Sequence, residues 1–270
     1  MPSSRKDETV RLDDAARTFN PGATALLIQD AVPWHAGTGQ DPRGADVTEL
    51  KVRRDGRIDI ANAGLVGVID LSQYTEIVIA AAQPQSFYES LFPNNPTTNE
   101  CAIHYALADW VEDGGVLSAH LADNYGGNWD GCFFLQGVTK AVHFSNENAI
   151  FTPGHPIVTG QYGGLNGGQI VDVAPYQDLT GWNYTSHGWF RHLPAEKTII
   201  FTEKEGGLAQ EHKPVMVEFP FGSGRVIASM MTLEWPYIGD TALTPNKKLL
   251  ANEIGYQLHL GGIAATLRAG

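Results

Sequence analysis

Residues 114–124 read Gly-Gly-Val-Leu-Ser-Ala-His-Leu-Ala-Asp-Asn, and this stretch decides the fold class. A double glycine ends a helical pattern, an apolar strand follows it, and the strand runs into a polar turn. In open α/β sheets, ligands bind outside the carboxyl ends of the strands. The turn that holds His120, Asp123 and Asn124 is therefore expected to face a ligand-binding crevice.

The segments on either side of this stretch predict a mostly parallel sheet. Residues 24–29 and 76–82 are continuous apolar runs, which are typical of strands buried on both faces. A helical pattern over residues 99–112, with Asn99 as its cap, precedes the strand at 116–119. Strand, helix and strand in this order indicate a parallel βαβ unit.

The C-terminal half predicts further strands and a long helix. Residues 197–202 have a strand pattern, and residues 215–219 and 225–230 flank a Pro-Phe-Gly-Ser-Gly turn that predicts a β-hairpin. A mostly apolar stripe over residues 246–260 predicts the last helix.

One principal domain is expected. Residues 1–22 are charged and form an N-terminal arm, residues 23–262 form a single α/β domain, and residues 263–270 form a tail. Within the domain, residues 121–193 are rich in Gly, Asn, Trp, Tyr and His and lack a long periodic run. A stretch of this length is too long for an ordinary loop, so it is expected to fold as an insertion over the site.

Composition narrows the function classes. The formal net charge of −12 disfavours binding to nucleic acid or to anionic membrane surfaces. No apolar run has the length of a membrane span, and the polar N-terminus lacks a signal peptide's apolar core, so a cytoplasmic protein is expected. Its two cysteines, Cys101 and Cys132, form neither a disulfide framework nor a zinc motif.

The order of these motifs resembles the class I glutamine amidotransferase-like superfamily, and within it the ThuA-like branch associated with sugar utilisation. The resemblance covers roughly residues 23–262 and rests on motifs that are weak singly but moderately specific in their order. These motifs are Leu26–Gln29, Ile77–Ala82, Gly114–His120, Trp129, Gly137, His143, Gly154–Ile157 and Phe221–Val226. The resemblance implies a flavodoxin-like fold, with helices on both faces of the sheet.

The chain departs from this superfamily at the catalytic positions. Active members have a cysteine in the turn after the Gly-Gly strand, where this chain has Ala119 or a neighbour within one position. Alanine has no nucleophilic atom, so the thioester route for glutamine hydrolysis is closed. The family's late histidine is also replaced, because the matching stretch reads Thr232-Leu233-Glu234-Trp235.

The remaining polar residues suggest acid–base chemistry. His120 and Glu234 are the candidate acid and base, and Asp123 is expected to orient His120. A hydrogen-bonded polar turn without chemistry is the alternative interpretation. His120, Asp123, His143 and His155 could bind a metal, but none has a tight ligand spacing, so neither a metal nor a cofactor is predicted.

The aromatic residues are the second feature of the sequence that indicates a binding site. Flat rings against sugar faces, with amide and carboxylate groups holding hydroxyls, suit a carbohydrate or a similar polar ligand. Packing of the insertion against the core is the alternative role for these rings. The candidate substrate-binding residues are Asn124, Trp129, Trp182, Trp189 and Trp235.

Two functions therefore remain open. The chain is either a degenerate amidotransferase-fold protein that binds or transforms a carbohydrate without glutaminase activity, or a non-enzymatic structural or assembly subunit. In the second case, the N-terminal arm is expected to contact neighbouring copies in a homo-oligomer, because it has too few apolar residues to order on its own domain.

Overall fold

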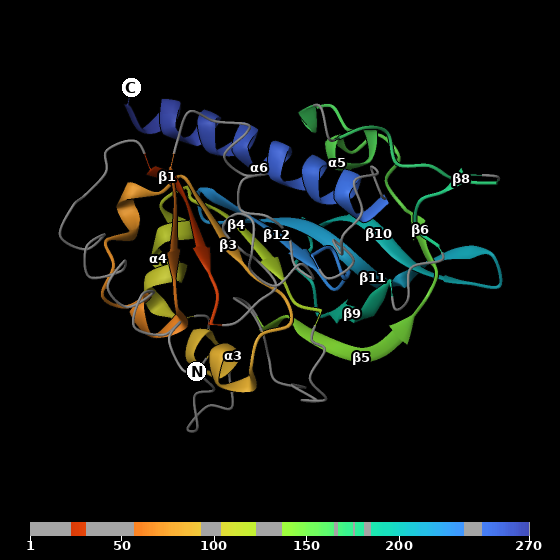
Figure 1. The fold of residues 1–270 in the computed structure, drawn as a ribbon, viewed down its shortest axis with the longest axis horizontal. Coiled ribbons are helices and arrows are strands. Elements are labelled where there is room, and N and C mark those ends of the chain that lie inside the picture. Colours follow the sequence, from red (N-terminus) through yellow and green to blue (C-terminus); the bar gives the residue numbers. More distant parts are fainter. Residues whose placement is uncertain are drawn as a thin grey trace, which may run out of the picture.

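The computed structural model of the chain describes residues 23–30, 57–92, 104–122, 137–164, 167–174, 176–180, 185–234 and 245–269. These residues form an α/β protein with one large mixed sheet (Figure 1). The arm at 1–22, Cys101 and Cys132 lie outside the described residues.

The large sheet has eight described strands in the order β2-β1-β3-β4-β12-β11-β10-β6. The first five strands run parallel to one another, and the remaining pairs are antiparallel. The parallel strands are β2 (Arg57–Ala61), β1 (Ala23–Ile28), β3 (Glu76–Ile79), β4 (Val116–His120) and β12 (Gly224–Ser229). The antiparallel extension consists of β11 (Leu208–Phe221), β10 (Thr198–Glu205) and β6 (Asn148–Ile150).

Helices cover both faces of this sheet, as expected. The first face carries the short 3-10 helices η1 (Ala63–Leu65) and η2 (Leu71–Gln73) with α3 (Gln85–Leu91) and α4 (Tyr105–Glu112). The opposite face carries α5 (Pro156–Thr159) and the long C-terminal helix α6 (Pro245–Ala269). None of the described helices is long and apolar enough to cross a bilayer.

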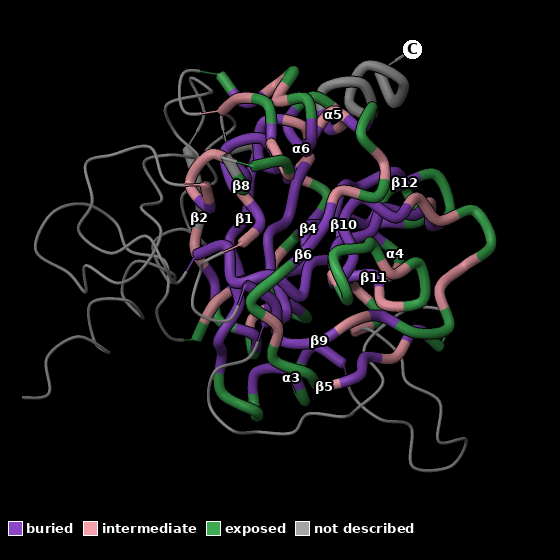
Figure 2. Tube along the Cα trace, turned by 90° about the vertical axis from the view of Figure 1, so that its right-hand side faces the viewer, coloured by how far each residue is buried: buried purple, intermediate pink, exposed green. Residues whose placement is uncertain are grey.

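Alternation along the central strands fills two apolar layers. Leu26 and Ile28 of β1 pack in the α3–α4 layer, whereas Leu27 between them packs in the α5–α6 layer. Strand β3 repeats this division with Ile77 and Ile79 on one side and Val78 on the other. Strands β3 and β4 are buried along their whole length, and so is most of β12 (Figure 2). Any polar side chain that these strands carry into either layer therefore needs a partner within the protein.

The predicted β-hairpin is present between β11 and β12. Its turn, Gly222–Ser223, connects the paired residues Phe221 and Gly224. Gly222 has a φ of +57°, and a Cβ there would lie 2.6 Å from the Cα of Glu112. Glycine is thus required both by the backbone conformation and by the close approach of α4.

The helix expected over residues 99–112 begins later than the pattern indicated. Its first residue is Tyr105, and His104 rather than Asn99 is the cap. His104 has non-helical backbone angles, and its Nδ1 accepts a hydrogen bond from the Ala106 N–H at 3.3 Å. An imidazole replaces the expected amide because its ring nitrogen satisfies one of the first-turn N–H groups.

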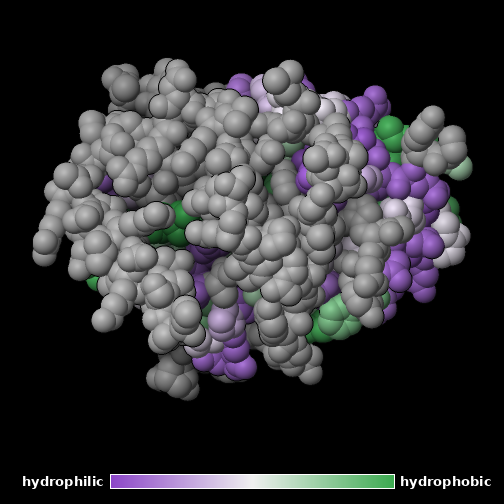
Figure 3. Space-filling view, in the orientation of Figure 1, coloured by the Kyte–Doolittle hydropathy of each residue, from purple (hydrophilic) through white to green (hydrophobic). Residues whose placement is uncertain are grey.

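The segment over residues 121–193, which the sequence predicts as an insertion, contributes strands to three different sheets. Strand β6 joins the large sheet beside β10, and the strands β5 (Thr139–Ser145) and β9 (Ser186–Arg191) form a separate antiparallel ribbon. A second small pair consists of β7 (Asp172–Val173) and β8 (Tyr176–Gln177). The described surface over β8 and the β10–β11 hairpin, at the right of Figure 3, is mainly hydrophilic.

Gly188 fixes the close pairing of the β5–β9 ribbon. It has a φ of +142°, and a Cβ there would lie 1.9 Å from the backbone oxygen of Ala141. We expect Gly188→Ala to lower the free energy of unfolding by at least about 2 kcal/mol, because backbone strain and overpacking add.

Chemical denaturation of the two proteins measures this loss. Gly154→Ala is the matched control, since a Cβ at Gly154 meets no atom within 4 Å. Equal stabilities for the two variants would contradict the assignment.

Candidate functional site

The carboxyl end of β4 carries two polar side chains that point toward α6. Ser118 and His120 occupy the layer in which β1 and β3 place Leu27 and Val78, whereas Ala119 faces the opposite, α3–α4 layer. Ala119 is fully buried there. The position expected to replace the nucleophile therefore lies within the apolar core.

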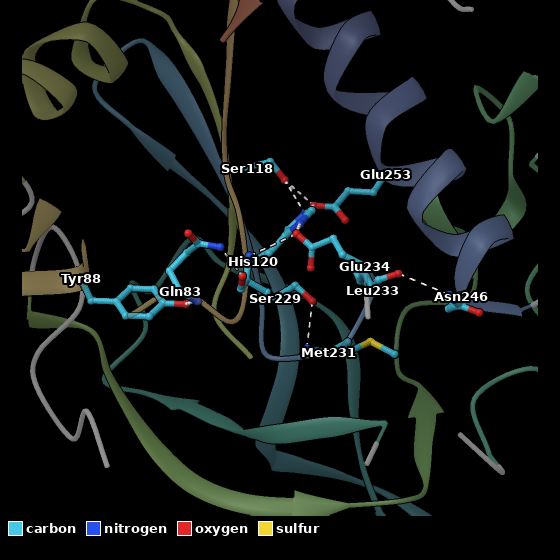
Figure 4. Close-up of polar contacts among 11 residues, drawn as sticks. Gln83, Tyr88, Ser118, His120, Ser229, Met231, Leu233, Glu234, Asn246 and Glu253 are labelled. Carbon is cyan, nitrogen blue, oxygen red and sulfur yellow. Dashed lines mark hydrogen bonds and ion pairs between the residues drawn. The ribbon is translucent and has the colours of Figure 1, made fainter. Parts of the chain in front are cut away.

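His120 lies between two glutamates (Figure 4). Its Nδ1 is 2.6 Å from Oε1 of Glu234, which follows β12, and its Nε2 is 2.9 Å from Oε1 of Glu253, which lies on α6. The structure thus brings together the two candidate acid–base residues His120 and Glu234. Their catalytic roles stay predictions.

Ser118 and a backbone amide complete this polar centre. The Ser118 hydroxyl donates to Glu253 and lies 3.4 Å from Nε2 of His120. The Ala81 N–H donates to Oε1 of Glu234 at 3.2 Å. The centre therefore connects β3, β4, the segment after β12, and α6.

The polar centre is closed to bulk solvent. The exposed fractions are 0% for His120, Glu234 and Glu253 and 1% for Ser118. A hydroxyl that is buried and donates to a carboxylate cannot attack a substrate from solution. The arrangement matches the geometry of a buried ionic network more closely than that of an open catalytic centre.

The charges of the centre determine the protonation of His120. Burial by itself lowers the pKa of His120, but the charges of Glu253 and Glu234, together with the hydrogen bonds to both, hold that pKa well above its usual range. In the protonated form both ring nitrogens donate, so each carboxylate receives one N–H. Such a cation is a hydrogen-bond donor and not a general base.

A second polar chain links the carboxyl ends of β2, β1 and β3. The Ala63 N–H donates to Oδ1 of Asp30 at 2.9 Å, and the Asp30 N–H donates to Oε1 of Gln83 at 2.7 Å. Gln83 returns a bond to the Ala81 carbonyl at 2.8 Å. Strand order reverses between β1 and β3, which is the position where open α/β sheets bind ligands.

Backbone strain occurs at this same edge. Ala82 has a φ of +56°, although alanine disfavours positive φ, and its N–H donates to the Ala122 carbonyl at 2.9 Å. Such a residue costs about 1–3 kcal/mol and persists only where the surrounding contacts determine it. The loop after β3 is therefore held in one conformation beside the polar centre.

Most of the other predicted site residues lie in segments that the structure does not describe. Asp123, Asn124, Trp129, Trp182 and Trp235 lie outside the described residues. Trp189 is described, on the β5–β9 ribbon.

The ribbon that carries Trp189 begins beside the carboxyl end of β12. Ser186 pairs with Met231, and the His187 N–H donates to the Met230 carbonyl at 2.9 Å. The Trp189 ring is partly exposed and lies 5.5 Å from the ring of His143, measured between centroids. Trp189 thus flanks the same edge of the sheet as the polar centre.

The histidines considered as metal ligands are engaged in other contacts. His155 caps α5 through Nδ1 and contacts Oε2 of Glu218 through Nε2 at 2.8 Å, whereas His143 contacts Glu203 through Nδ1 at 2.8 Å. Within the described part of the chain, no group of three or more His, Cys, Asp or Glu side chains could hold a metal ion.

Sequence reasoning missed Glu253, which provides half of the clamp on His120. The predicted last helix was treated as an apolar stripe, but Asn246, Glu253 and Gln257 are also buried on it. Gln257 Nε2 donates to the carbonyls of Ile77 and Val116, both at 3.0 Å. Polar residues at positions 246, 253 and 257 share the face of Leu250 and Ile254, and that spacing was the available signal.

Comparison with known proteins gives one sequence relative. An uncharacterized protein of Clostridium acetobutylicum is 27% identical over 236 residues, which cover 86% of this chain and 20% of the relative. This chain therefore spans about a fifth of the length of that relative. No protein-family model matches the chain.

Solved structures of similar fold have low sequence identity. A cytoplasmic protein of Salmonella typhimurium has a TM-score of 0.45 and 14% identity, covering 86% of this chain and 98% of its own. A second cytoplasmic protein of Salmonella typhimurium LT2 has a TM-score of 0.41 and 14% identity, over 90% and 98%. A β-galactosidase from Rahnella sp. R3 has a TM-score of 0.42 and 12% identity, over 88% and 31%.

The raised pKa of His120 predicts a pH dependence of stability. Protonation of His120 stabilises the fold fully below the unfolded pKa of about 6.5, and this contribution is lost as pH rises through the higher folded pKa. The difference in unfolding free energy between the wild type and His120→Gln should therefore shrink from pH 6 into the alkaline range.

Denaturant titrations at a series of pH values measure this difference. His259→Gln is the control, because His259 is exposed and stacks on Tyr162 away from the polar centre. A difference for His120→Gln that stays constant or grows with pH would contradict the assigned charge state.

Proposed function

We propose that this chain is a non-hydrolytic α/β domain of the class I glutamine amidotransferase-like fold, ThuA-like in type. Its function is to bind a carbohydrate or similar polar small molecule at the carboxyl edge of the sheet. The parallel strands follow the order β2-β1-β3-β4-β12, which is the flavodoxin-like order that the resemblance implies. The cytoplasmic location expected from the sequence is part of the proposal.

The absence of hydrolysis follows from the chemistry of the polar centre. Ala119 offers no nucleophile, and the Ser118 hydroxyl donates to Glu253. His120 is bracketed by Glu234 and Glu253, so its Nε2 is not available to accept a proton from Ser118. Acid–base roles for His120 and Glu234, with Asp123 orienting the ring, would require Glu253 to release the imidazole.

The observation that carries the binding proposal is the position of Trp189. Its partly exposed ring lies beside Lys213 of β11 and His143 of β5, on the ribbon that begins next to the carboxyl end of β12. An aromatic wall near convergent polar groups is the usual composition of a small-molecule site. Such a site needs no nucleophile.

A ligand titration tests this proposal directly. We expect saturable binding of one or more sugars or polyols from a broad panel, measured by ligand-observed NMR and calorimetry. Trp189→Leu should weaken that binding roughly tenfold, which corresponds to about 1.4 kcal/mol, because it removes the aromatic ring that borders the proposed site.

The control is Phe144→Leu, which removes a half-exposed ring of the same ribbon that contacts His187. Ammonia release from glutamine should stay at background in all three proteins. A panel without any binder, or equal affinities for the two variants, would contradict the proposal.

A second candidate function, that of a structural or assembly subunit, is favoured by the closed state of the polar centre. The His120 network ties four parts of the fold together without using a ligand. The one sequence relative reported above, in which the matched region is 20% of a longer chain, suits a module of this kind. In this case residues 1–22 would contact neighbouring copies.

Light scattering distinguishes this candidate. An assembly subunit should have a mass at least twice the 29.3 kDa of the chain, and deleting residues 1–22 should lower it. A monomer at all concentrations, unchanged by the deletion, would exclude homo-oligomerisation through the arm.

A further inference from the structure

Basic and imidazole side chains gather around Trp189. The chain as a whole is acidic, with a formal net charge of −12. Nevertheless, the β5–β9 ribbon and the neighbouring part of β11 carry several such groups close together. These are His143 of β5, Arg191 of β9 and Lys213 of β11.

Two of these groups lie over the indole ring. The Lys213 Nζ is 5.3 Å from the Trp189 ring centroid, and the Arg191 Cζ is 5.6 Å from it. Arg191 and Trp189 are two residues apart on β9, opposite Thr139 and Ala141 of β5, so both project from the same face of the ribbon. The ring therefore holds both cations by cation–π attraction.

The acidic groups nearby are already engaged. Glu203 contacts Nδ1 of His143 at 2.8 Å, and Lys213 Nζ contacts Oε2 of Glu205 at 3.0 Å. The hydrogen bond and charge of Lys213, followed by the charges of His212 and His143, lower the pKa of Glu205. Each of these carboxylates thus has a cationic or imidazole neighbour.

Arg191 differs from its neighbours. It is exposed, and no carboxylate in the described ranges lies within 4.0 Å of its guanidinium, which contacts the Trp189 ring instead. A guanidinium held at a fixed place by an aromatic ring presents a planar fork of N–H donors that matches a carboxylate.

We propose that the Trp189 surface binds a sugar that carries a carboxylate, a hexuronate, with Arg191 as the group that selects for the acid. This proposal rests on the proposed carbohydrate-binding function and names its ligand class. Arg191 pairs with the carboxylate, and Lys213 and the exposed Nε2 side of His143 add donors for sugar oxygens. The aromatic ring positions the cations.

The experiment compares galacturonate with galactose, using calorimetry on the full chain at low ionic strength. We expect galacturonate to bind more tightly than galactose, and Arg191→Gln to weaken galacturonate roughly tenfold while leaving galactose unchanged, since hydrogen bonds to charged groups are worth more than neutral ones. Lys197→Gln removes an equal charge just before β10 and should change neither affinity.

The outcomes distinguish failure of the acid selectivity from failure of carbohydrate binding itself. Equal affinities for galactose and galacturonate, unchanged by Arg191→Gln, would overturn the acid selectivity and leave carbohydrate binding intact. Acetate bound as tightly as galacturonate would indicate a simple anion site and would overturn the hexuronate. Binding of neither sugar, with no other binder in the wider panel, would overturn both proposals.

Discussion

The clamp of Glu234 and Glu253 on His120 is the interaction on which the rest of the fold depends. It places an ionic group between the sheet and α6, in a layer whose other side chains are mainly apolar. Burying such charges is costly, and removing one partner of a buried pair typically costs about 3–5 kcal/mol. Apolar contacts could hold α6 at several positions along the sheet, whereas the contacts of Glu253 with His120 and Ser118 require one.

The clamp also bears on the chemistry that His120 can perform. A catalytic imidazole needs one nitrogen free to exchange a proton, and here both nitrogens face carboxylates. A cysteine in place of Ala119 would face the α3–α4 layer and not the polar centre. The absence of hydrolysis that we propose is therefore attributed to the whole centre and not to position 119 alone.

The sequence alone predicted most of the parallel strands and two residues of the polar centre, His120 and Glu234. The continuous apolar runs identified β1, β3 and β4, because strands buried on both faces contain few polar residues. His120 and Glu234 were paired because both follow strands that end at one edge. Glu253 was missed because a glutamate on an amphipathic helix normally faces water, and only the tertiary contact with His120 shows that it is buried. The β5–β9 ribbon was also missed, since Gly188 and the irregular register conceal its alternation.

Helix α6 follows all the strands of the large sheet in sequence, and this order has a consequence for synthesis on the ribosome. Ser118 and His120 are made about halfway along the chain, whereas the carboxylate that satisfies them is at position 253. During translation, β1, β3 and β4 therefore precede by more than a hundred residues the carboxylate that pairs with Ser118 and with Nε2 of His120. The face that α6 covers cannot be buried until this helix has emerged, so burial of the polar centre is coupled to synthesis of the segment that holds Glu253.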